Sequence, residues 1–277
     1  MPRPDLFSAG PEQGARQLRW IRILLGAIVL VFVGAGFLYF KSQSLVTPTD
    51  PNTLCPTKQS PTEVVVILLD PSNRLGKPQE IQLRSIIDRV ATQVSRFGLV
   101  EVYRIPASAS DVPEPVLHLC NPGSADEISS VYSNPDFVAR KWRMFTDSVM
   151  STVTRETTAD EQATSPIFEG VQAIGVRSFG RRMFDHSPKH LVIVSDLLQN
   201  VPGKVNMYRS IPSFDDFRST TYYKQIRADL TEVHVFVVYI NRPLVTAQGR
   251  QHIGFWERYL LDQRAVLDSV VQLFGDR

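Results

Sequence analysis

The sequence predicts an α/β protein: a three-layer α/β/α domain with a mostly parallel six-stranded sheet, preceded by one N-terminal transmembrane helix. Three observations predict this class. An uncharged apolar run lies near the N-terminus, apolar runs typical of buried strands recur along the rest of the chain, and amphipathic helical segments separate most of them. Strands that alternate with helices form parallel sheets covered on both faces.

The apolar run Ile23–Phe40 contains no charged residue and would span roughly 27 Å at 1.5 Å per residue, close to the hydrocarbon thickness of a bilayer. A cleaved signal peptide is the alternative, although the run is longer than a usual signal core and no small-x-small cleavage site comes after it. Arginines crowd the segment before the run, whereas only Lys41 lies closely after it. Because positive charge stays cytoplasmic, we expect the N-terminus inside and the main domain periplasmic or extracellular.

These features divide the chain into a cytoplasmic tail (1–19), a transmembrane helix (20–41), a proline-rich linker (42–62) and an α/β domain (63–277). The polar composition of the tail predicts disorder. The linker holds Pro48, Pro51, Pro56 and Pro61, which predicts a semi-extended spacer. The chain has 30 Lys and Arg against 28 Asp and Glu, a net charge of +2, so no large basic field points to nucleic acid.

The expected strands are, in order, Glu63–Asp70, Leu99–Ile105, Val116–Leu119, His190–Asp196, Val233–Ile240 and a short final Val270–Phe274. The first of them, EVVVILLD, is an unbroken apolar run that fits a strand buried on both faces. The expected helices are a stripe from Leu83 to Phe97 that Gly98 ends, Pro135–Thr154, a helix opened by Pro166, and His252–Leu261. The short link between the second and third strands allows that pair to run antiparallel.

The two cysteines, Cys55 and Cys120, are expected to form a disulfide. If the third strand runs antiparallel, its end at Cys120 lies at the edge of the sheet where the first strand begins, and Cys55 enters at that edge. The residues between Cys55 and Glu63 can cross two strand spacings of about 4.8 Å. An exported domain would favour the pairing. Two unrelated buried thiols are the alternative.

Polar side chains gather where the strands end. Asp70 ends the first strand and Ser72 comes just after it, Asp196 ends the fourth strand, and Ser165 precedes the helix between them. Ligands of open parallel sheets bind beyond the carboxyl ends of the strands, so these residues should converge. Carboxylate and hydroxyl oxygens suit a hard cation, and the pattern predicts a site for Mg²⁺ or Mn²⁺.

These segments resemble a von Willebrand factor A-like domain with a degenerate metal-ion-dependent adhesion site. That family's site uses Asp-x-Ser-x-Ser after the first strand, a Thr on a later loop and an Asp after the fourth strand. Asp70 and Ser72 match the first two positions, Ser165 stands for the Thr, and Asp196 matches the last. Arg74 stands where the second Ser should be, so its charge could replace the ion and pair with Asp70 or Asp196. The resemblance covers about residues 63–274.

The same residues also have a purely structural interpretation. Asp70 with Pro71 directly after it is a common type I turn signal. Ser165 could cap the helix that Pro166 opens, and Asp196 could cap the segment after the fourth strand. His118 and His234 lie in expected strands, where a packed or hydrogen-bonded imidazole is the better interpretation.

A long segment, Leu197–Thr220, comes after the fourth strand and contains the motif Phe214, Asp215, Asp216 and Phe217. Such an insertion would overhang the site, and we interpret the motif as a partner-binding loop. A solvated excursion is the alternative. The sequence has no P-loop, no Rossmann glycine fingerprint and no G-x-S-x-G elbow.

The leading functional prediction is a non-enzymatic, membrane-tethered interaction protein of an envelope complex. The resemblance implies that the domain presents its site to a protein partner, whose carboxylate could complete the coordination of an ion. A metal-dependent phosphoester hydrolase is the first alternative, because clustered aspartates can hold catalytic Mg²⁺. A purely structural envelope subunit without an ion is the second.

Overall fold

The computed structural model describes residues 11–44, 47–72, 74–124, 134–158, 162–242 and 245–275, with the side chains of the first helix described at 20–37. The first ten residues of the predicted tail, and Asn73 of the turn after the first strand, lie outside this described part. The chain forms two compact units, Met1–Thr47 and Pro48–Arg277.

The first unit is a single helix, α1 (Pro11–Ser44). Its 18-residue window Trp20–Phe37 has a mean hydropathy of 2.2, so the helix is long and apolar enough to cross a membrane. None of this window is buried against the rest of the protein. The helix extends beyond the apolar run, so the prediction of a disordered tail is wrong for residues 11–19. Pro11 suits the first helical position, and Gln, Ala, Leu and Arg in the next segment favour a helix.

The second unit contains the predicted six-stranded sheet, in the order β3-β2-β1-β4-β7-β8. Its strands are β1 (Val64–Leu69), β2 (Leu99–Arg104), β3 (Pro115–Cys120), β4 (Lys189–Ser195), β7 (Val233–Ile240) and β8 (Val266–Leu273). The β2–β3 pair is antiparallel and every other pair is parallel. This is the strand order of a doubly wound fold, and it confirms the predicted fold class.

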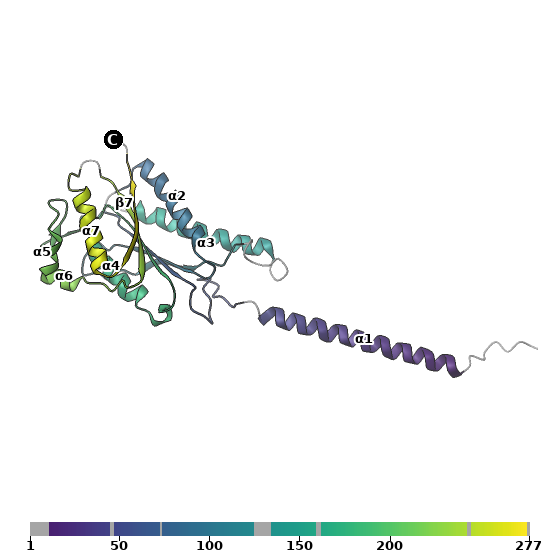
Figure 1. Cartoon of the computed structure of the whole chain (residues 1–277). Coiled ribbons are helices and arrows are strands. Elements are labelled where there is room, and N and C mark those ends of the chain that lie inside the picture. The colour runs from purple at the N-terminus through teal and green to yellow at the C-terminus, as the bar shows by residue number, and fades with distance from the viewer. Residues whose placement is uncertain are drawn as a thin grey trace, which may run out of the picture. The chain divides into compact units, whose positions relative to one another are not determined.

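Helices cover both faces of the sheet, as Figure 1 shows. One face packs against α2 (Lys77–Gln93) and α3 (Pro135–Thr157), the other against α4 (Ile167–Ile174) and α7 (Arg250–Asp262). Alternate residues of β1 enter the two cores: Val65 and Ile67 face α2 and α3, whereas Val66 and Leu68 face α4 and α7. Because both faces are buried, the sequence of β1 is an unbroken apolar run.

Three regions differ from the prediction. The final strand begins at Val266, four residues earlier than expected, because its exposed edge position does not require continuous apolar residues. A hairpin, β5 (Asn200–Val201) and β6 (Val205–Asn206), and a short helix, α5 (Phe214–Ser219), occupy the segment expected as a loop, and a second short helix, α6 (Thr221–Gln225), comes directly after it. A π-helical turn, η1 (Gly175–Phe179), and a 3-10 turn, η2 (Arg182–Phe184), come after α4.

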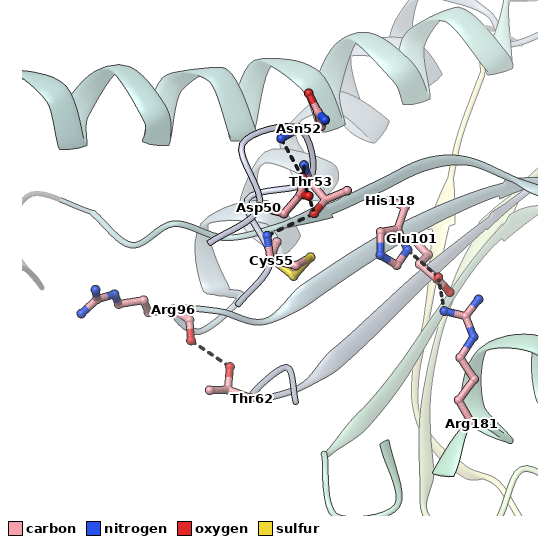
Figure 2. Close-up of a disulfide and its surroundings, with 10 residues drawn as sticks. Asp50, Asn52, Thr53, Cys55, Thr62, Arg96, Glu101, His118 and Arg181 are labelled. Atoms are coloured by element: carbon pink, nitrogen blue, oxygen red, sulfur yellow. Dashed lines mark hydrogen bonds and ion pairs between the residues drawn. A yellow bond between two sulfur atoms is a disulfide. The ribbon is translucent and has the colours of Figure 1, made fainter. Parts of the chain in front are cut away.

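Much of the predicted linker belongs to the folded domain. Leu54 is 1% exposed within the core, and the backbone N–H groups of Asn52 and Thr53 donate to Asp50 Oδ1, both at 2.8 Å. The Thr62 hydroxyl donates to the carbonyl of Arg96 at 2.8 Å (Figure 2). The segment from residue 48 onward therefore forms a compact loop rather than a semi-extended spacer.

The predicted disulfide between Cys55 and Cys120 is present, with the two Cα atoms 4.7 Å apart (Figure 2). Cys120 ends the antiparallel strand β3, opposite Leu99 at the start of β2. Its backbone N–H donates to the carbonyl of Thr53 at 2.8 Å. The bond therefore joins the loop before β1 to the edge strand at the amino end of the sheet.

Candidate functional site

The structure brings Asp70, Ser72 and Ser165 together just beyond the carboxyl end of β1. All three are buried. Asp70 Oδ2 accepts hydrogen bonds from the hydroxyls of Ser165 at 2.9 Å and Ser195 at 2.6 Å, and Asp70 Oδ1 accepts from the backbone N–H of Ser72 at 3.0 Å. The prediction that these segments converge is confirmed. Ser165 donates to Asp70 and does not cap α4, so the capping interpretation of Ser165 is wrong.

Asp196, the second predicted carboxylate, lies directly after β4 and is also buried. Its Oδ1 accepts from the backbone N–H of Leu198 at 3.0 Å, which is a local turn contact. Its Oδ2 accepts from Arg242 Nε at 3.2 Å and from the Tyr208 hydroxyl at 3.4 Å. Asp196 therefore has a cationic partner inside the protein.

Arg242 is a cation of the site that the family motif did not point to, since the motif had pointed to Arg74. The Arg242 side chain is 14% exposed, and its Nη1 donates to the backbone carbonyl of Arg74 at 2.9 Å. Gln248 holds this segment in place: its Oε1 accepts from Arg242 N–H at 2.6 Å, and its Nε2 donates to the Asp196 carbonyl at 3.0 Å. Arg242 lies two residues after β7, so the rule that placed Asp70 and Asp196 at this edge could have found it too.

Burial is the main cause of the unusual titration of Asp70. Loss of solvent and the nearby charge of Asp196 raise the pKa of Asp70 to about 6, although hydrogen bonds from Ser195, from the Ser72 N–H and from Ser165 act in the opposite direction. Arg242 pairs with Asp196, so the carboxylate of Asp70 relies on neutral donors. The site therefore holds a carboxyl group whose charge the fold only partly compensates.

The predicted ligands have the oxygen atoms that Mg²⁺ or Mn²⁺ prefers, but one of these oxygens already contacts an arginine. Ser72 Oγ is a buried oxygen with no hydrogen-bond partner among the described residues, as a metal ligand would be. However, the Arg242 guanidinium already contacts Asp196 Oδ2, and within the described residues no group of three or more His, Cys, Asp or Glu side chains could hold an ion. As arranged, these residues do not fit a divalent ion unless Arg242 moves away.

A polar cavity of about 320 Å³ adjoins the two carboxylates. Its lining residues are Ser72, Gln162, Ala163, Thr164, Ser165, Asn200, Asn206 and Tyr208. Ser165 and Tyr208 connect it directly to Asp70 and Asp196. The β5–β6 hairpin supplies Asn200 and Asn206, which the sequence did not reveal because two-residue strands carry no periodic signal.

The partner-binding prediction for the Phe214–Phe217 motif is wrong for its two aromatic residues. Phe214 and Phe217 are buried, and Phe217 stacks on Phe168 with ring centroids 5.2 Å apart. The spacing of three residues places both rings on one face of α5, toward the core. Asp215 and Asp216 are exposed, and Asp215 forms an ion pair with Arg258 at 2.6 Å.

A further buried carboxylate, Glu101 on β2, lies outside this site. Its Oε1 contacts His118 Nδ1 at 2.9 Å and Arg181 Nη1 at 3.3 Å, as Figure 2 shows, and its Oε2 accepts from the Ser178 hydroxyl at 2.5 Å. Burial raises the pKa of Glu101, but the bonds from His118 and Ser178 and the charge of Arg181 outweigh it and hold the pKa below its usual value. The hydrogen-bonded role expected for His118 is confirmed, as it is for His234, which contacts Asp268 at 2.9 Å.

No protein-family model matches the chain, and no curated protein matches its sequence. Among solved structures, the conserved hypothetical protein BatB from Bacteroides thetaiotaomicron is 13% identical with a TM-score of 0.38, over 77% of this chain and 91% of that one. An aerotolerance-related membrane protein from Bacteroides fragilis is 10% identical with a TM-score of 0.36, over 76% and 92%. The SpRpn10 VWA domain is 9% identical with a TM-score of 0.40, over 78% and 90%.

These similarities concern the backbone arrangement alone, and the assignment of site residues rests on the contacts described above. The sheet has five parallel strands and one antiparallel strand in doubly wound order, with helices on both faces. This is the three-layer α/β/α architecture that the resemblance to a von Willebrand factor A-like domain implied.

Proposed function

We propose that the chain is a membrane-tethered, non-enzymatic interaction protein whose von Willebrand factor A-like domain presents the carboxyl-edge site to a protein partner. One observation carries the proposal: two buried carboxylates, Asp70 and Asp196, lie close together beside an open polar cavity. Two buried carboxylates close together destabilise a fold because their charges repel and are poorly solvated. Carboxyl groups with a perturbed pKa beside a cavity are typical of functional sites.

The contacts of the serine hydroxyls support a binding role over catalysis. Ser165 and Ser195 both donate to Asp70, and Ser195 Oγ also accepts from the Leu197 N–H at 2.7 Å. A nucleophilic serine needs a base that takes its proton, and a carboxylate already engaged by several donors suits that role poorly. The phosphoester hydrolase alternative would need a catalytic ion where Arg242 now contacts Asp196.

The N-terminal helix supports a membrane tether. Arginines precede its apolar window and only Lys41 lies closely after it, which favours a cytoplasmic N-terminus and a domain in the periplasm or outside the cell. The Cys55–Cys120 disulfide is consistent with that side, because structural disulfides persist in oxidising compartments. A reporter fused to the C-terminus tests the orientation, and a cytoplasmic signal would contradict it.

Arg242 is the proposed resident cation of the site, in place of Mg²⁺ or Mn²⁺. The guanidinium supplies the positive charge that Asp196 needs, and the Gln248 bridge keeps it there. Calorimetry of the full chain in detergent with each ion tests the choice. We expect no heat of binding for the wild type, and binding by Arg242→Ala, in which the two carboxylates are left without that cation. Tight Mg²⁺ binding by the wild type would restore the metal version of the site.

Affinity capture of the tagged full chain from native membranes tests the interaction itself. The variants Asp70→Asn and Asp196→Asn keep the shape of the site and remove its charge, while Asp147→Ala, an exposed residue of α3, is the control. We expect both site variants to lose a protein that the wild type and the control retain. An identical set of captured proteins in all four preparations would favour a purely structural subunit.

A further inference from the structure

The size and the lining residues of the cavity beside Asp70 and Asp196 limit which ligands it can bind. Its volume of about 320 Å³ is near the lower limit of about 300 Å³ for small-ligand sites, so it suits one side chain or one small molecule. None of the described side chains that line it is charged. Its selectivity therefore depends on which hydrogen-bonding groups of the lining are still available.

Three of the four hydroxyl donors of the lining are already in use. Ser165 donates to Asp70 at 2.9 Å, Tyr208 donates to Asp196 at 3.4 Å, and Thr164 donates to the carbonyl of Ala107. A hydroxyl has one hydrogen and two lone pairs, so these three groups can offer a ligand only acceptors. Asn200 Nδ2 likewise donates one hydrogen bond to the Ala163 carbonyl at 2.8 Å.

Two further oxygens of the lining, Ser72 Oγ and Asn206 Oδ1, are buried and have no partner in the described part of the chain. The Ser72 residue is only 7% exposed, so bulk water does not readily satisfy it. Buried polar atoms without a partner are uncommon and weaken a fold, and they call for a specific explanation. Both atoms line this one cavity. The Asn206 oxygen can only accept a hydrogen bond, whereas the Ser72 hydroxyl can accept or donate one, so a ligand that donates hydrogen bonds would satisfy both.

We infer that the cavity binds the ammonium group of a lysine side chain supplied by the protein partner. An ammonium has three rotatable donors and a compact charge, which suits acceptors spread around a small cavity. The neighbouring carboxylates of Asp70 and Asp196 favour a positive charge, and the described donors to Asp70 are all neutral groups. A planar guanidinium fits less well, because each carboxylate oxygen already accepts a bond from the protein. The inference rests on the proposed function and specifies the chemistry of its partner.

The test is an NMR titration of the full chain in detergent micelles with n-butylammonium, the lysine side chain without its backbone. We expect saturable shifts of the Asn206 side-chain amide and the Ser72 backbone amide. Butylguanidinium should bind at least threefold more weakly, and sodium butyrate and MgCl₂ should leave both signals in place. Saturable shifts with butyrate or MgCl₂ but not with butylammonium would overturn the inference.

Two variants sharpen the titration. Asn206→Asp adds a negative charge at an acceptor without a partner, so butylammonium should bind at least threefold more tightly. Ser72→Ala removes the other acceptor and should weaken binding by a similar factor. The control Asn52→Asp makes the same charge change at an exposed position near the disulfide and should leave binding unchanged. Thermal unfolding of each variant establishes that it is folded.

The outcomes separate this inference from the proposed function. A partner that depends on Asp70 and Asp196 in the capture experiment, together with no butylammonium binding, would refute the lysine assignment alone. Loss of partner dependence would refute the interaction role, whatever the small cation does. Equal binding of butylammonium to the wild type and to Asn206→Asp would place the cation outside the cavity and also refute the assignment.

Discussion

Glu101 on β2 is buried among groups that compensate its charge, whereas Asp70 at the carboxyl end of the neighbouring strand β1 faces a second carboxylate. Arg181 and His118 contact Glu101, and its pKa lies below the usual value. Asp70 is held by hydroxyls and one backbone N–H, and its pKa rises to about 6. Ionisation stabilises the fold at the first site and weakens it at the second.

The difference arises from where each residue lies in the sheet. Glu101 pairs with His118 across the antiparallel β2–β3 ladder, near the disulfide that closes the amino end. Asp70 lies at the edge where parallel strands end and loops begin. Under the proposed function, the incompletely compensated carboxyl group at this edge takes part in recognition of the partner. Four predictions test this contrast.

The largest expected effect belongs to the amino end. The disulfide Cys55–Cys120 closes a loop with a sequence separation of 65 residues, and chain-entropy arguments assign such a bond about 4 kcal/mol of stability. We expect Cys55→Ala with Cys120→Ala to lower the free energy of unfolding by about that amount, measured by urea denaturation of the full chain in detergent. Reduced wild type is the control. A loss below about 1 kcal/mol would mean that packing around Leu54 already holds this end.

Glu101→Gln should cost about 2 kcal/mol near pH 7. The change removes a buried charge that Arg181 and His118 contact, and the exposure of those two partners keeps the loss below that of a fully buried pair. Because the folded pKa of Glu101 is lowered, its contribution is present above its unfolded pKa and disappears as pH falls through the folded pKa. The difference between variant and wild type should therefore shrink below about pH 4.5.

The matched control for Glu101 is Glu114→Gln. Glu114 pairs with Arg177 at the surface, and its side chain is 71% exposed. Exposed pairs contribute about 0–1 kcal/mol, so this variant should unfold almost as the wild type does. Equal losses in both variants would mean that the burial of Glu101 does not strengthen its contacts.

Asp70→Asn should have the opposite sign and stabilise the domain by about 2 kcal/mol at pH 7.5. A pKa raised from 3.8 to about 6 corresponds to about 3 kcal/mol, less the imperfect hydrogen bonds of the amide. Because the folded pKa is raised, the favourable contribution of Asp70 is complete below its unfolded pKa and is lost as pH rises through about 6. The gain should therefore develop between about pH 4 and pH 6.5 in unfolding measured across that range.

The same experiment detects a cation that the contacts do not reveal. If Asp70→Asn destabilises the domain at pH 7.5, the ionised carboxylate has a positively charged partner in solution. Repeating the measurement with EDTA and with Mg²⁺ identifies whether that partner is a divalent ion. An effect of Mg²⁺ confined to the wild type would contradict the assignment of Arg242 as the resident cation.

The elements that could be predicted from the sequence are those whose pattern is local or periodic. The apolar run of β1, the antiparallel β3 and the meeting of Asp70 with Asp196 are consequences of strand periodicity and of the rule for sheet edges. The disulfide came from the same topology. Arg242 was missed because the family motif covers only the segments around Asp70, Ser165 and Asp196, whereas Arg242 comes from a loop far along the chain. The Phe214 and Phe217 rings were misplaced because the segment was taken for a loop, although their spacing fits one face of a helix.

The smallest expected effect concerns Ser72. Its hydroxyl is buried with no partner among the described residues, so Ser72→Ala should relieve a desolvation cost and raise the free energy of unfolding by about 1 kcal/mol. Ser165→Ala is the matched control, because it removes a hydroxyl that donates to Asp70 and should lower stability by about the same amount. Urea denaturation at pH 7.5 measures both. A loss of stability in Ser72→Ala would mean that the hydroxyl has a partner in the free protein. A gain in stability together with weaker butylammonium binding would mean that the Ser72 hydroxyl contributes to recognition and destabilises the fold. Glu101, by contrast, is expected to stabilise the fold.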